Sequence, residues 1–395
     1  MRIGLLTTSF PRTPDDIAGT FVLGFARALA ALGHEIEVLA PEPSERMDPP
    51  RWSNIQVVHV PYLRPRSWQR TFYGAGVPDN LQRDRRAYLG LLPYPIALAR
   101  QALARSAHWD ALVSHWALPS ALVAGLARRG KPHLAVFHSA DVHLLTRMPL
   151  RRALARQLAA NASALWFVTA QHRDTFLELL PTDLRPDSAQ RTYVAPMGVD
   201  PPNADTAARR DRARQAFGLS RFTLLALGRL VPVKGLDSAI GAVANQNVTL
   251  LVAGKGPERE RLEQLARTQH ADVRWLGNVM GERKALLLSA ADAFVMPSRT
   301  LESGRSEGVP HALLEALAHG LPVIATRVGG MASLLSDGTT ALLVPPDEPG
   351  QLRTAIDRLQ HDHALREQIG SQGRALVEPY HWSRLGPRIE ALLRT

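Results

Sequence analysis

Two glutamates separated by seven residues carry the clearest chemical signal in this sequence. Glu307 precedes a Gly-Val-Pro turn, and Glu315 lies about a turn and a half inside the helix that the pattern predicts for residues 311–319. Carboxylates accept hydrogen bonds from hydroxyl groups, and the free amides at a helix start favour an anion. The spacing therefore suits a nucleotide diphosphate that carries a hydroxylated sugar at each end.

A βαβ unit must position these glutamates. The apolar run at residues 293–296 predicts a buried strand before the loop, and residues 322–326 predict the next strand after the helix. In open parallel sheets, such loops form the ligand crevice at the carboxyl ends of the strands. We therefore expect the amides near Gly308 and Val309 to bind the anion. The alternative, two glutamates solvated at the surface, does not explain their spacing.

Two cations follow another predicted strand. Residues 222–227 form an apolar run, Gly228 and Arg229 come directly after it, and Lys234 closes the short loop before the next predicted helix. Arginine offers a planar fork of donors and lysine a point charge, a combination that suits a diphosphate. The alternative is a pair of solvated surface charges.

Polar side chains also end two predicted strands in the first half of the chain. Residues 111–114 lead to His115, and residues 133–137 lead to His138 and Asp141. Strand ends face the crevice of a parallel sheet, so these side chains are candidates for the site. An isolated histidine is more often structural, which makes His138 with Asp141 the stronger candidate.

The amino-terminal segment predicts the start of a nucleotide-binding fold. A strand at residues 3–8 is followed by Gly19, a helix at residues 21–32 and a second strand at residues 35–40. Gly19 at a helix start permits close approach of the backbone to a ligand. The G-x-G-x-x-G fingerprint is absent, so the sequence gives little support to a dinucleotide site.

The segment from Glu307 to Glu315 resembles the E-x7-E signature of the retaining glycosyltransferases of family 4, which have the GT-B fold. The loop at residues 228–235 and the H-x-x-D pattern of His138 and Asp141 resemble further motifs of that family, so the resemblance covers essentially the whole chain. It implies an α/β protein with two Rossmann-like β/α/β domains that face each other across a cleft.

The resemblance also implies roles for the candidate residues. Arg229 and Lys234 would stabilise the leaving diphosphate, an electrostatic task. Glu315 would hold the ribose hydroxyls, and Glu307 and His138 would position the donor sugar. Retention of anomeric configuration is implied as well, and because no unambiguous nucleophile stands out we expect attack on the same face.

Four further residues are implied to bind the donor. Gly19 would lie beside the phosphates and Asp141 at the sugar pocket, while Gly277 and Val279 would lie near the nucleobase and meet it largely through backbone groups. The sequence therefore leaves UDP-sugars and GDP-sugars both open as donors. We found no D-x-D acidic motif, so we expect that neither a metal ion nor another cofactor is required.

Length and motif order predict two domains. Residues 1–196 are predicted to form an N-terminal Rossmann-like acceptor-binding domain and residues 197–378 a C-terminal Rossmann-like nucleotide-sugar-binding domain. Residues 379–395, with a helix at residues 382–393, are predicted to cross back to the first domain.

The composition limits which binding partners and which cellular compartment can be expected. The 395 residues include no cysteine, which excludes disulfides and thiolate chemistry. The sequence shows neither a signal-peptide h-region nor an apolar run near the roughly 20 residues that span a bilayer. We therefore expect a cytoplasmic protein, able to associate with the cytoplasmic face of the membrane. The net charge of +11 favours anionic partners, but no motif typical of nucleic-acid binding is present.

The acceptor is predicted from the basic first half of the chain. Residues 62–84 combine arginines with Trp68, Phe72 and Tyr73, and arginine-bearing helices are predicted near residues 95–107 and 148–160. These features favour a glycan or lipid-linked acceptor at an anionic membrane surface, as in bacterial polysaccharide or lipid-linked glycan synthesis. The alternative is an ordinary loop packed on its own aromatic side chains.

Three other functions stay open from the sequence. A GT-B-fold sugar-nucleotide epimerase would use the same cleft without an acceptor. An NAD-dependent oxidoreductase fits the α/β pattern but lacks the fingerprint. A basic non-enzymatic nucleic-acid-binding protein fits the charge, but gives no reason for Glu307 and Glu315.

Overall fold

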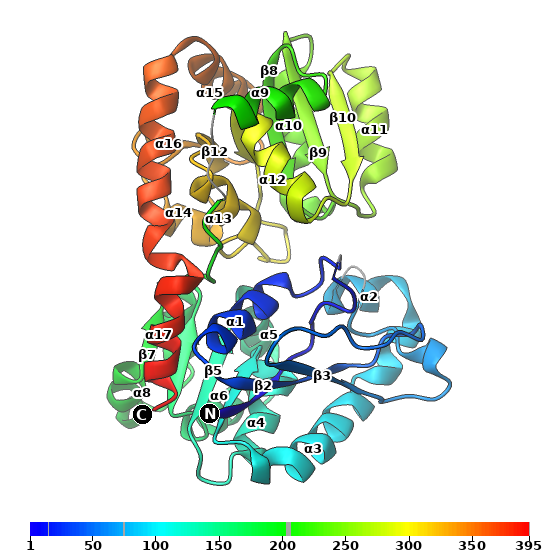
Figure 1. The fold of residues 1–395 in the computed structure, drawn as a ribbon, viewed down its shortest axis with the longest axis vertical. Helices are drawn as coiled ribbons and strands as arrows, with labels where there is room; N and C mark the ends of the chain where they lie inside the picture. The colour runs from blue at the N-terminus through cyan, green and yellow to red at the C-terminus, as the bar shows by residue number, and fades with distance from the viewer. Residues whose placement is uncertain (15, 74–75, 203–206, 395) are drawn as a thin grey trace. The chain divides into compact units, whose positions relative to one another are not determined.

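The computed structural model describes residues 1–14, 16–73, 76–202 and 207–394, which divide into two compact units (Figure 1). Domain 1 comprises Met1–Gly198 together with Trp382–Thr395, and domain 2 comprises Val199–His381. Each contains one parallel sheet covered by helices, which confirms the predicted α/β class with two Rossmann-like sheets. Across the ranges described, no helix is both long enough and apolar enough to cross a membrane.

The sheet of domain 1 has seven parallel strands in the order β3-β2-β1-β4-β5-β6-β7. Its central strands are buried along their length, as expected for a parallel sheet with helices on both faces. The strands are β1 (Arg2–Leu6), β2 (Glu35–Pro41), β3 (Ile55–Val60), β4 (Ala111–His115), β5 (His133–Phe137), β6 (Ala164–Phe167) and β7 (Thr192–Val194).

Helices cover both faces of this sheet. Phe25 of α1 packs on His115 of β4, whereas Leu98 of α3 shares an apolar cluster with Leu112 of the same strand. Since residues three apart on a strand point to opposite faces, α1 and α3 lie on opposite sides. The helices are α1 (Thr20–Ala31), α2 (Val77–Arg83), α3 (Pro93–Arg105), α4 (Leu122–Ala127), α5 (Ser139–Arg147), α6 (Arg151–Ala160), α7 (Ala170–Glu178), α8 (Arg185–Gln190) and α17 (Trp382–Leu392), with the short 3₁₀ helices η1 (Arg66–Trp68) and η2 (Arg85–Gly90).

The arginine-rich stretch at residues 62–84 is more ordered than predicted. It contains η1 and α2, and Phe72 is buried against the ring of Tyr94 at a centroid distance of 4.3 Å. The Tyr73 hydroxyl donates to the carbonyl oxygen of Pro41 at 3.0 Å. The Phe72 ring is therefore held in the core of the domain and is not available to an acceptor or a membrane, whereas contact of the half-buried Tyr73 with either stays a prediction. Trp68 is exposed at 44%.

Domain 2 has a six-stranded parallel sheet in the order β10-β9-β8-β11-β12-β13, with an apolar cluster on each face. Its strands are β8 (Phe222–Leu227), β9 (Val248–Ala253), β10 (Val273–Gly277), β11 (Ala293–Met296), β12 (Val323–Thr326) and β13 (Leu342–Val344). Its helices are α9 (Ala207–Ala216), α10 (Leu236–Val243), α11 (Arg259–Thr268), α12 (Gly281–Ala290), α13 (His311–Ala318), α14 (Gly329–Leu334), α15 (Pro349–His361) and α16 (His363–Val377).

Two sequence predictions for domain 2 need correction or restriction. The sequence pattern of residues 351–369 predicts a single helix, which is wrong, because the chain breaks at Asp362, whose side chain accepts from the Leu365 amide at 2.9 Å and caps α16. The pattern of residues 203–218 predicts a charged helical connector. Residues 203–206 of it lie outside the described part of the chain, and α9 covers residues 207–216.

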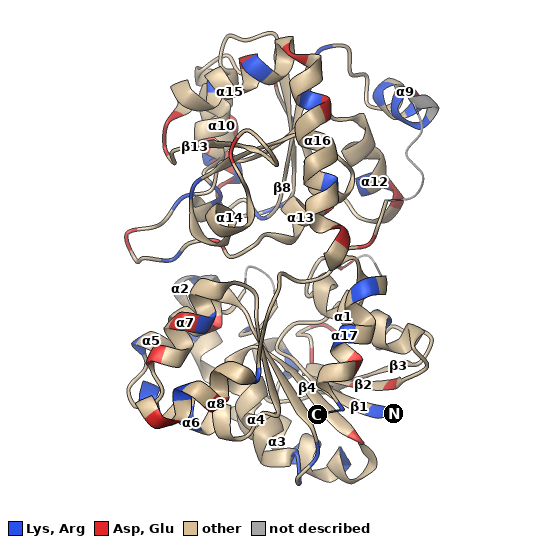
Figure 2. Ribbon diagram, turned by 90° about the vertical axis from the view of Figure 1, so that its left-hand side faces the viewer, with Lys and Arg blue, Asp and Glu red and all other residues tan. Residues whose placement is uncertain are grey.

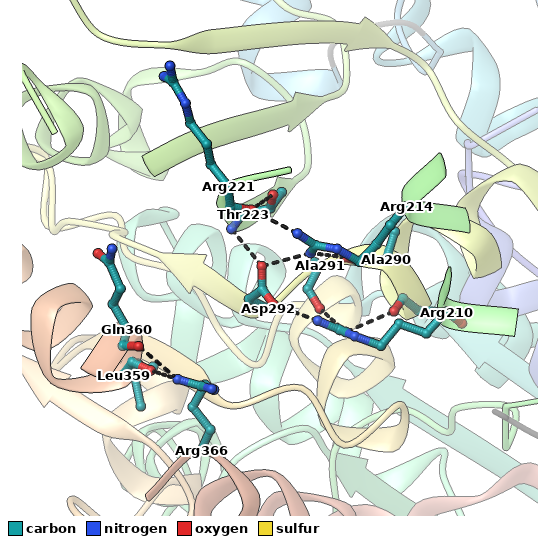
Figure 3. A network of polar contacts seen from close by, with 11 residues as sticks. Arg210, Arg214, Arg221, Thr223, Ala290, Ala291, Asp292, Leu359, Gln360 and Arg366 are labelled. Atoms are coloured by element: carbon teal, nitrogen blue, oxygen red, sulfur yellow. Dashed lines mark hydrogen bonds and ion pairs between the residues drawn. The ribbon is translucent and has the colours of Figure 1, made fainter. Parts of the chain in front are cut away.

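Two arginines of α9 bind the carboxylate of Asp292, the residue before β11 in domain 2 (Figure 3). Arg210 Nη2 lies 2.5 Å and Arg214 Nη1 2.9 Å from the two oxygens of Asp292, which also accepts from the Thr223 amide at 2.8 Å. The same guanidinium groups donate to carbonyl groups at the end of α12, at Ser289, Ala290 and Ala291. These bonds satisfy carbonyls that a helix end leaves open, so α12 is held to α9 and to the sheet.

Helix α17 completes domain 1 from the far end of the sequence. It lies beside α1 (Figure 2), and the Trp382 ring fills the space over Gly24 and Gly198. A Cβ atom would come within 2.5 Å of that ring at Gly24 and 2.4 Å at Gly198. The prediction of a C-terminal helix that returns to the first domain is confirmed.

Replacing Trp382 by alanine should lower the free energy of unfolding of domain 1 by about 3–5 kcal/mol, because the ring is buried and leaves a cavity. Hydrogen exchange of the β1 and α1 amides measures this effect locally. The control is Ser383→Ala, which changes an exposed position of the same helix. Equal effects of both substitutions, or faster exchange in domain 2 alone, would contradict the packing role.

Candidate active site

In domain 2, the loop after β8 touches the loop after β11. Lys234 Nζ lies 2.9 Å from Glu307 Oε2, and the two side chains are 12% and 17% exposed. The backbones also meet, because Gly235 has a left-handed conformation with φ 59° and a Cβ there would lie 2.0 Å from the Pro297 carbonyl oxygen. The structure thus brings together two predicted site residues that are 73 positions apart.

The backbone of Glu307 is fixed from the opposite direction by the start of α14. The Gly330 amide donates to the Glu307 carbonyl oxygen at 3.1 Å. A Cβ on Gly329, which has φ 52°, would lie 1.9 Å from the same oxygen. Glu307 is therefore a well-positioned residue on an otherwise irregular loop.

Glu315 lies on α13 between two basic side chains. Its Oε1 atom is 2.5 Å from Lys284 Nζ on α12 and 3.3 Å from His311 Nδ1, one turn earlier on α13. Burial raises the pKa of Glu315, but the charges and hydrogen bonds of His311 and Lys284 outweigh it and lower the pKa to about 2. Glu315 is therefore ionised at neutral pH and can only accept hydrogen bonds.

A narrow recess adjoins the Lys234 side chain at the ends of β8 and β11. It is lined by Gly228, Arg229, Lys234, Met296 and Pro297 among others. Gly308 and Val309 directly precede Pro310, the residue that caps α13. In the described part of the chain, the backbone amides of Gly308 and Val309 donate no hydrogen bond. This loop has the free donors that an anion requires.

Of the two residues predicted to lie near the nucleobase, Gly277 is the last residue of β10 and Val279 follows that strand. The Gly277 carbonyl oxygen accepts from the Gly254 amide at 2.7 Å, and the Val279 side chain is buried in an apolar cluster. The buried side chain leaves only backbone groups of Val279 available to a ligand. Contact of Gly277 and Val279 with a nucleobase stays a prediction.

In domain 1, His138 lies among aromatic rings at the carboxyl ends of β4 and β5. Its ring centroid is 5.2 Å from Phe21, 4.9 Å from Trp116 and 5.4 Å from His115. Phe21 comes two residues after Gly19, the residue that precedes α1. Burial, and then the nearby His172, lower the pKa of His138 to about 3, so its imidazole is neutral at neutral pH.

Asp141 is buried and bonded to backbone. Its Oδ2 atom accepts from the Ala117 amide at 2.6 Å and its Oδ1 atom from the Val142 amide at 2.9 Å. The first bond fixes the chain after Trp116, which has an unusual φ of 71°. Asp141 therefore positions the aromatic surroundings of His138, and its direct contact with a donor stays a prediction.

Comparison with known proteins identifies the family. Residues 208–376 match the model for "Glycosyl transferases group 1", and residues 18–187 match "Glycosyl transferase 4-like domain". The chain is 30% identical over 295 residues to the GDP-mannose-dependent alpha-(1-6)-phosphatidylinositol monomannoside mannosyltransferase of Mycolicibacterium smegmatis, covering 70% of this chain and 74% of that protein. The chain belongs to the glycosyl transferases group 1 family.

This glycosyltransferase also resembles a second mannosyltransferase and several solved structures. The Corynebacterium glutamicum enzyme for monoacylated phosphatidylinositol monomannoside is 29% identical, over 77% of this chain and 82% of that protein. Sucrose-phosphate synthase from Thermosynechococcus elongatus gives a TM-score of 0.74 at 21% identity, covering 100% of this chain and 98% of that one. Anabaena HepE in complex with UDP gives 0.73 at 18% identity, covering 100% of both chains.

These similarities confirm the predicted GT-B fold and a family 4 retaining glycosyltransferase that uses a nucleotide-sugar donor. Glycosyl transfer thus replaces the epimerase, oxidoreductase and nucleic-acid-binding hypotheses. The roles assigned to individual site residues stay predictions.

Sequence reasoning missed three residues beside the candidate site. His311 was detectable, since it lies four positions before Glu315 on the same helix. Lys284 is 31 positions away from Glu315 and gave no local signal. Lys255, next to the glycine turn after β9, has its Cε atom 3.9 Å from the point where a Gly277 Cβ would lie.

The buried Asp141 predicts a specific pH dependence. Burial raises its pKa to about 7 from an ordinary value of 3.8, although backbone hydrogen bonds oppose the shift. Between those values the folded state binds more protons than the unfolded state, so the stability contributed by Asp141 falls as pH rises through this window. The free energy of unfolding of wild type relative to Asp141→Asn should therefore decrease from about pH 5 to about pH 8.

Chemical denaturation of both proteins at the two pH values measures this difference, in which the shared histidines cancel. Asp48→Asn, at an exposed position, is the control and should show no such trend. A wild-type advantage that increases with pH would contradict the raised pKa of Asp141.

Proposed function

We propose that this glycosyltransferase transfers a hexosyl group from a nucleotide sugar, with GDP-mannose as the first candidate, to a hydroxyl group of a lipid-linked acceptor. The observation that carries the proposal is the pair of carboxylate–cation contacts around α13, Lys234 with Glu307 and Lys284 with Glu315. They supply anionic acceptors for sugar hydroxyls and a cation for the diphosphate between them.

The donor would enter by exchanging one ion pair for two ligand contacts. A diphosphate supplies the negative charge that Glu307 now gives to Lys234, and hydroxyl groups of the donor sugar supply hydrogen bonds to Glu307. Arg229, Gly308 and Val309 are proposed to complete the phosphate site. Because Lys234 and Glu307 are largely buried, each group left without its partner would be costly, which favours a donor that satisfies both.

In the proposed reaction, the bond between the anomeric carbon and the β-phosphate oxygen breaks as the acceptor hydroxyl attacks from the same face. Positive charge develops on the sugar and negative charge on the departing diphosphate, which accepts the hydroxyl proton. Lys234 and Arg229 stabilise the departing charge, and neutral His138 positions the sugar. No covalent enzyme intermediate is needed, and the configuration of the sugar is retained.

The choice of donor and acceptor is supported by the relatives. The two bacterial mannosyltransferases carry GDP-mannose and phosphatidylinositol mannosides in their names. The HepE structure contains UDP, so UDP-sugars are the second candidate. A net charge of +11 favours an anionic lipid acceptor, and we place the enzyme at the cytoplasmic face of the membrane.

Glu315 tests the donor site. GDP should raise the melting temperature of the wild type more than UDP or ADP does, and Glu315→Gln should weaken GDP binding by about 10–100-fold. The reason is that an ionised acceptor for two ribose hydroxyls becomes an amide. Calorimetric titration gives the dissociation constants, and the exposed Glu302→Gln is the matched control. No response of the wild type to any of these nucleotides at millimolar concentration would refute the proposal.

Substitution of Glu307 distinguishes a role in positioning the donor sugar from a role in binding the nucleotide. Glu307→Gln should lower turnover of the nucleotide sugar by about 10²–10³. Affinity for free GDP should stay equal or increase, since Lys234 no longer has to leave a carboxylate when the diphosphate binds. Parallel measurements of turnover and GDP affinity check this pattern. A loss of GDP affinity as large as that of Glu315→Gln would show that Glu307 is not at the sugar end.

A further inference from the structure

Within the residues that the structure describes, the exposed large apolar side chains all lie in domain 1. They are densest around η2 and the first turn of α3, at Tyr88, Leu89, Leu91, Leu92 and Ile96, with Leu92 78% and Ile96 63% exposed. Single exposed apolar residues are common, but five within nine positions form a patch that indicates a binding surface.

The start of helix α3 is apolar on both of its faces. Tyr94, Leu98 and Ala102 are fully buried in the core of domain 1, whereas Leu92 and Ile96 point outward. A helix at a water-exposed surface normally carries polar residues on its outer face. The outer face of this helix therefore has a composition typical of a covered surface.

The segment that carries this patch has charges of a single sign. Residues 85–109 contain no aspartate or glutamate, and Arg85, Arg86 and Arg100 are exposed. Asp84, the acidic residue that precedes this run, is engaged by Arg70 at 3.2 Å. Apolar side chains beside arginines match the boundary between acyl chains and anionic headgroups.

We propose that the η2–α3 surface, defined as Tyr88, Leu89, Leu91, Leu92 and Ile96 with Arg85, Arg86 and Arg100, docks on an anionic phospholipid bilayer. Leu92 and Ile96 enter the headgroup region, and the arginines contact lipid phosphates. The charge favours a bilayer over a protein partner, because a protein would have to supply several acidic groups around an apolar centre.

The position of this surface links docking to the proposed function, on which this step rests. The buried Tyr94 hydroxyl donates to the Thr7 carbonyl oxygen at 2.8 Å, which ties the first turn of α3 to the residue just after β1. That is the carboxyl edge of the domain 1 sheet, where His115 and His138 follow β4 and β5. Docking through α3 therefore brings this edge to the layer in which a lipid-linked acceptor presents its hydroxyl groups.

Sedimentation with vesicles tests the proposal on the full chain. The wild type should bind vesicles of phosphatidylcholine mixed with phosphatidylglycerol and not those of phosphatidylcholine alone. The double substitution Leu92→Ser with Ile96→Ser should lower the partition constant at least about 10-fold. Arg85→Gln and Arg86→Gln should each lower it about fivefold at low salt.

The matched control is a second apolar and basic site in domain 1. Leu150, 79% exposed, stands before Arg151 and Arg152 at the start of α6. Leu150→Ser with Arg151→Gln removes equivalent groups and should leave vesicle binding unchanged. All variants change exposed positions, and an unchanged melting temperature verifies their folding.

Two outcomes would overturn the proposal. One is equal vesicle binding by wild type and the Leu92/Ile96 variant, or a loss caused by the Leu150 variant in its place. The other is a change from dimer to monomer in light scattering of the Leu92/Ile96 variant, with vesicle binding retained, which would assign the surface to a second copy of the chain. Binding of GDP, UDP and ADP is measured in parallel: if the wild type binds none of them, the proposed function is refuted, whatever the vesicles show.

Discussion

Contact between backbones, with no room for a side chain, is the constraint on which the candidate site of domain 2 depends. At Gly235 the loop after β8 lies against the Pro297 carbonyl, and at Gly329 the start of α14 lies against the Glu307 carbonyl. A Cβ atom at either position would separate the loops by more than an ion pair tolerates. Lys234 can reach Glu307 because these two contacts close the loops together.

The two domains stabilise opposite charge states by different physical means. In domain 2, neighbouring cations keep Glu315 ionised although it is largely buried, with a pKa of about 2. In domain 1, burial without a carboxylate partner keeps His138 neutral, with a pKa of about 3. Glu315 is thus suited to accept hydrogen bonds only, whereas a neutral imidazole can both donate and accept without adding charge near a sugar.

The strands and the charged motifs could be predicted from the sequence because their signals are local. An apolar run such as residues 293–296 specifies a buried strand. The spacing of Glu307 and Glu315 can be recognised because both residues lie in one short segment. Lys284 could not be predicted as a partner of Glu315, since its position depends on how α12 packs and on the arginines of α9 that hold it. The burial of Phe72 was missed for the same reason: it follows from tertiary packing against Tyr94.

The return of α17 to α1 makes domain 1 discontinuous in the sequence. During synthesis, domain 1 therefore cannot complete its packing before domain 2 has been made. Val199–His381 forms a continuous domain that can fold as soon as it emerges. Most of domain 1 emerges earlier, but the surface at Gly24 and Gly198 has no packing partner until Trp382 has been synthesised. At bacterial and eukaryotic elongation rates that delay is roughly 10–40 s. During that interval the first domain lacks the packing of Trp382 on Gly24 and Gly198, and α17 supplies that packing once it is made.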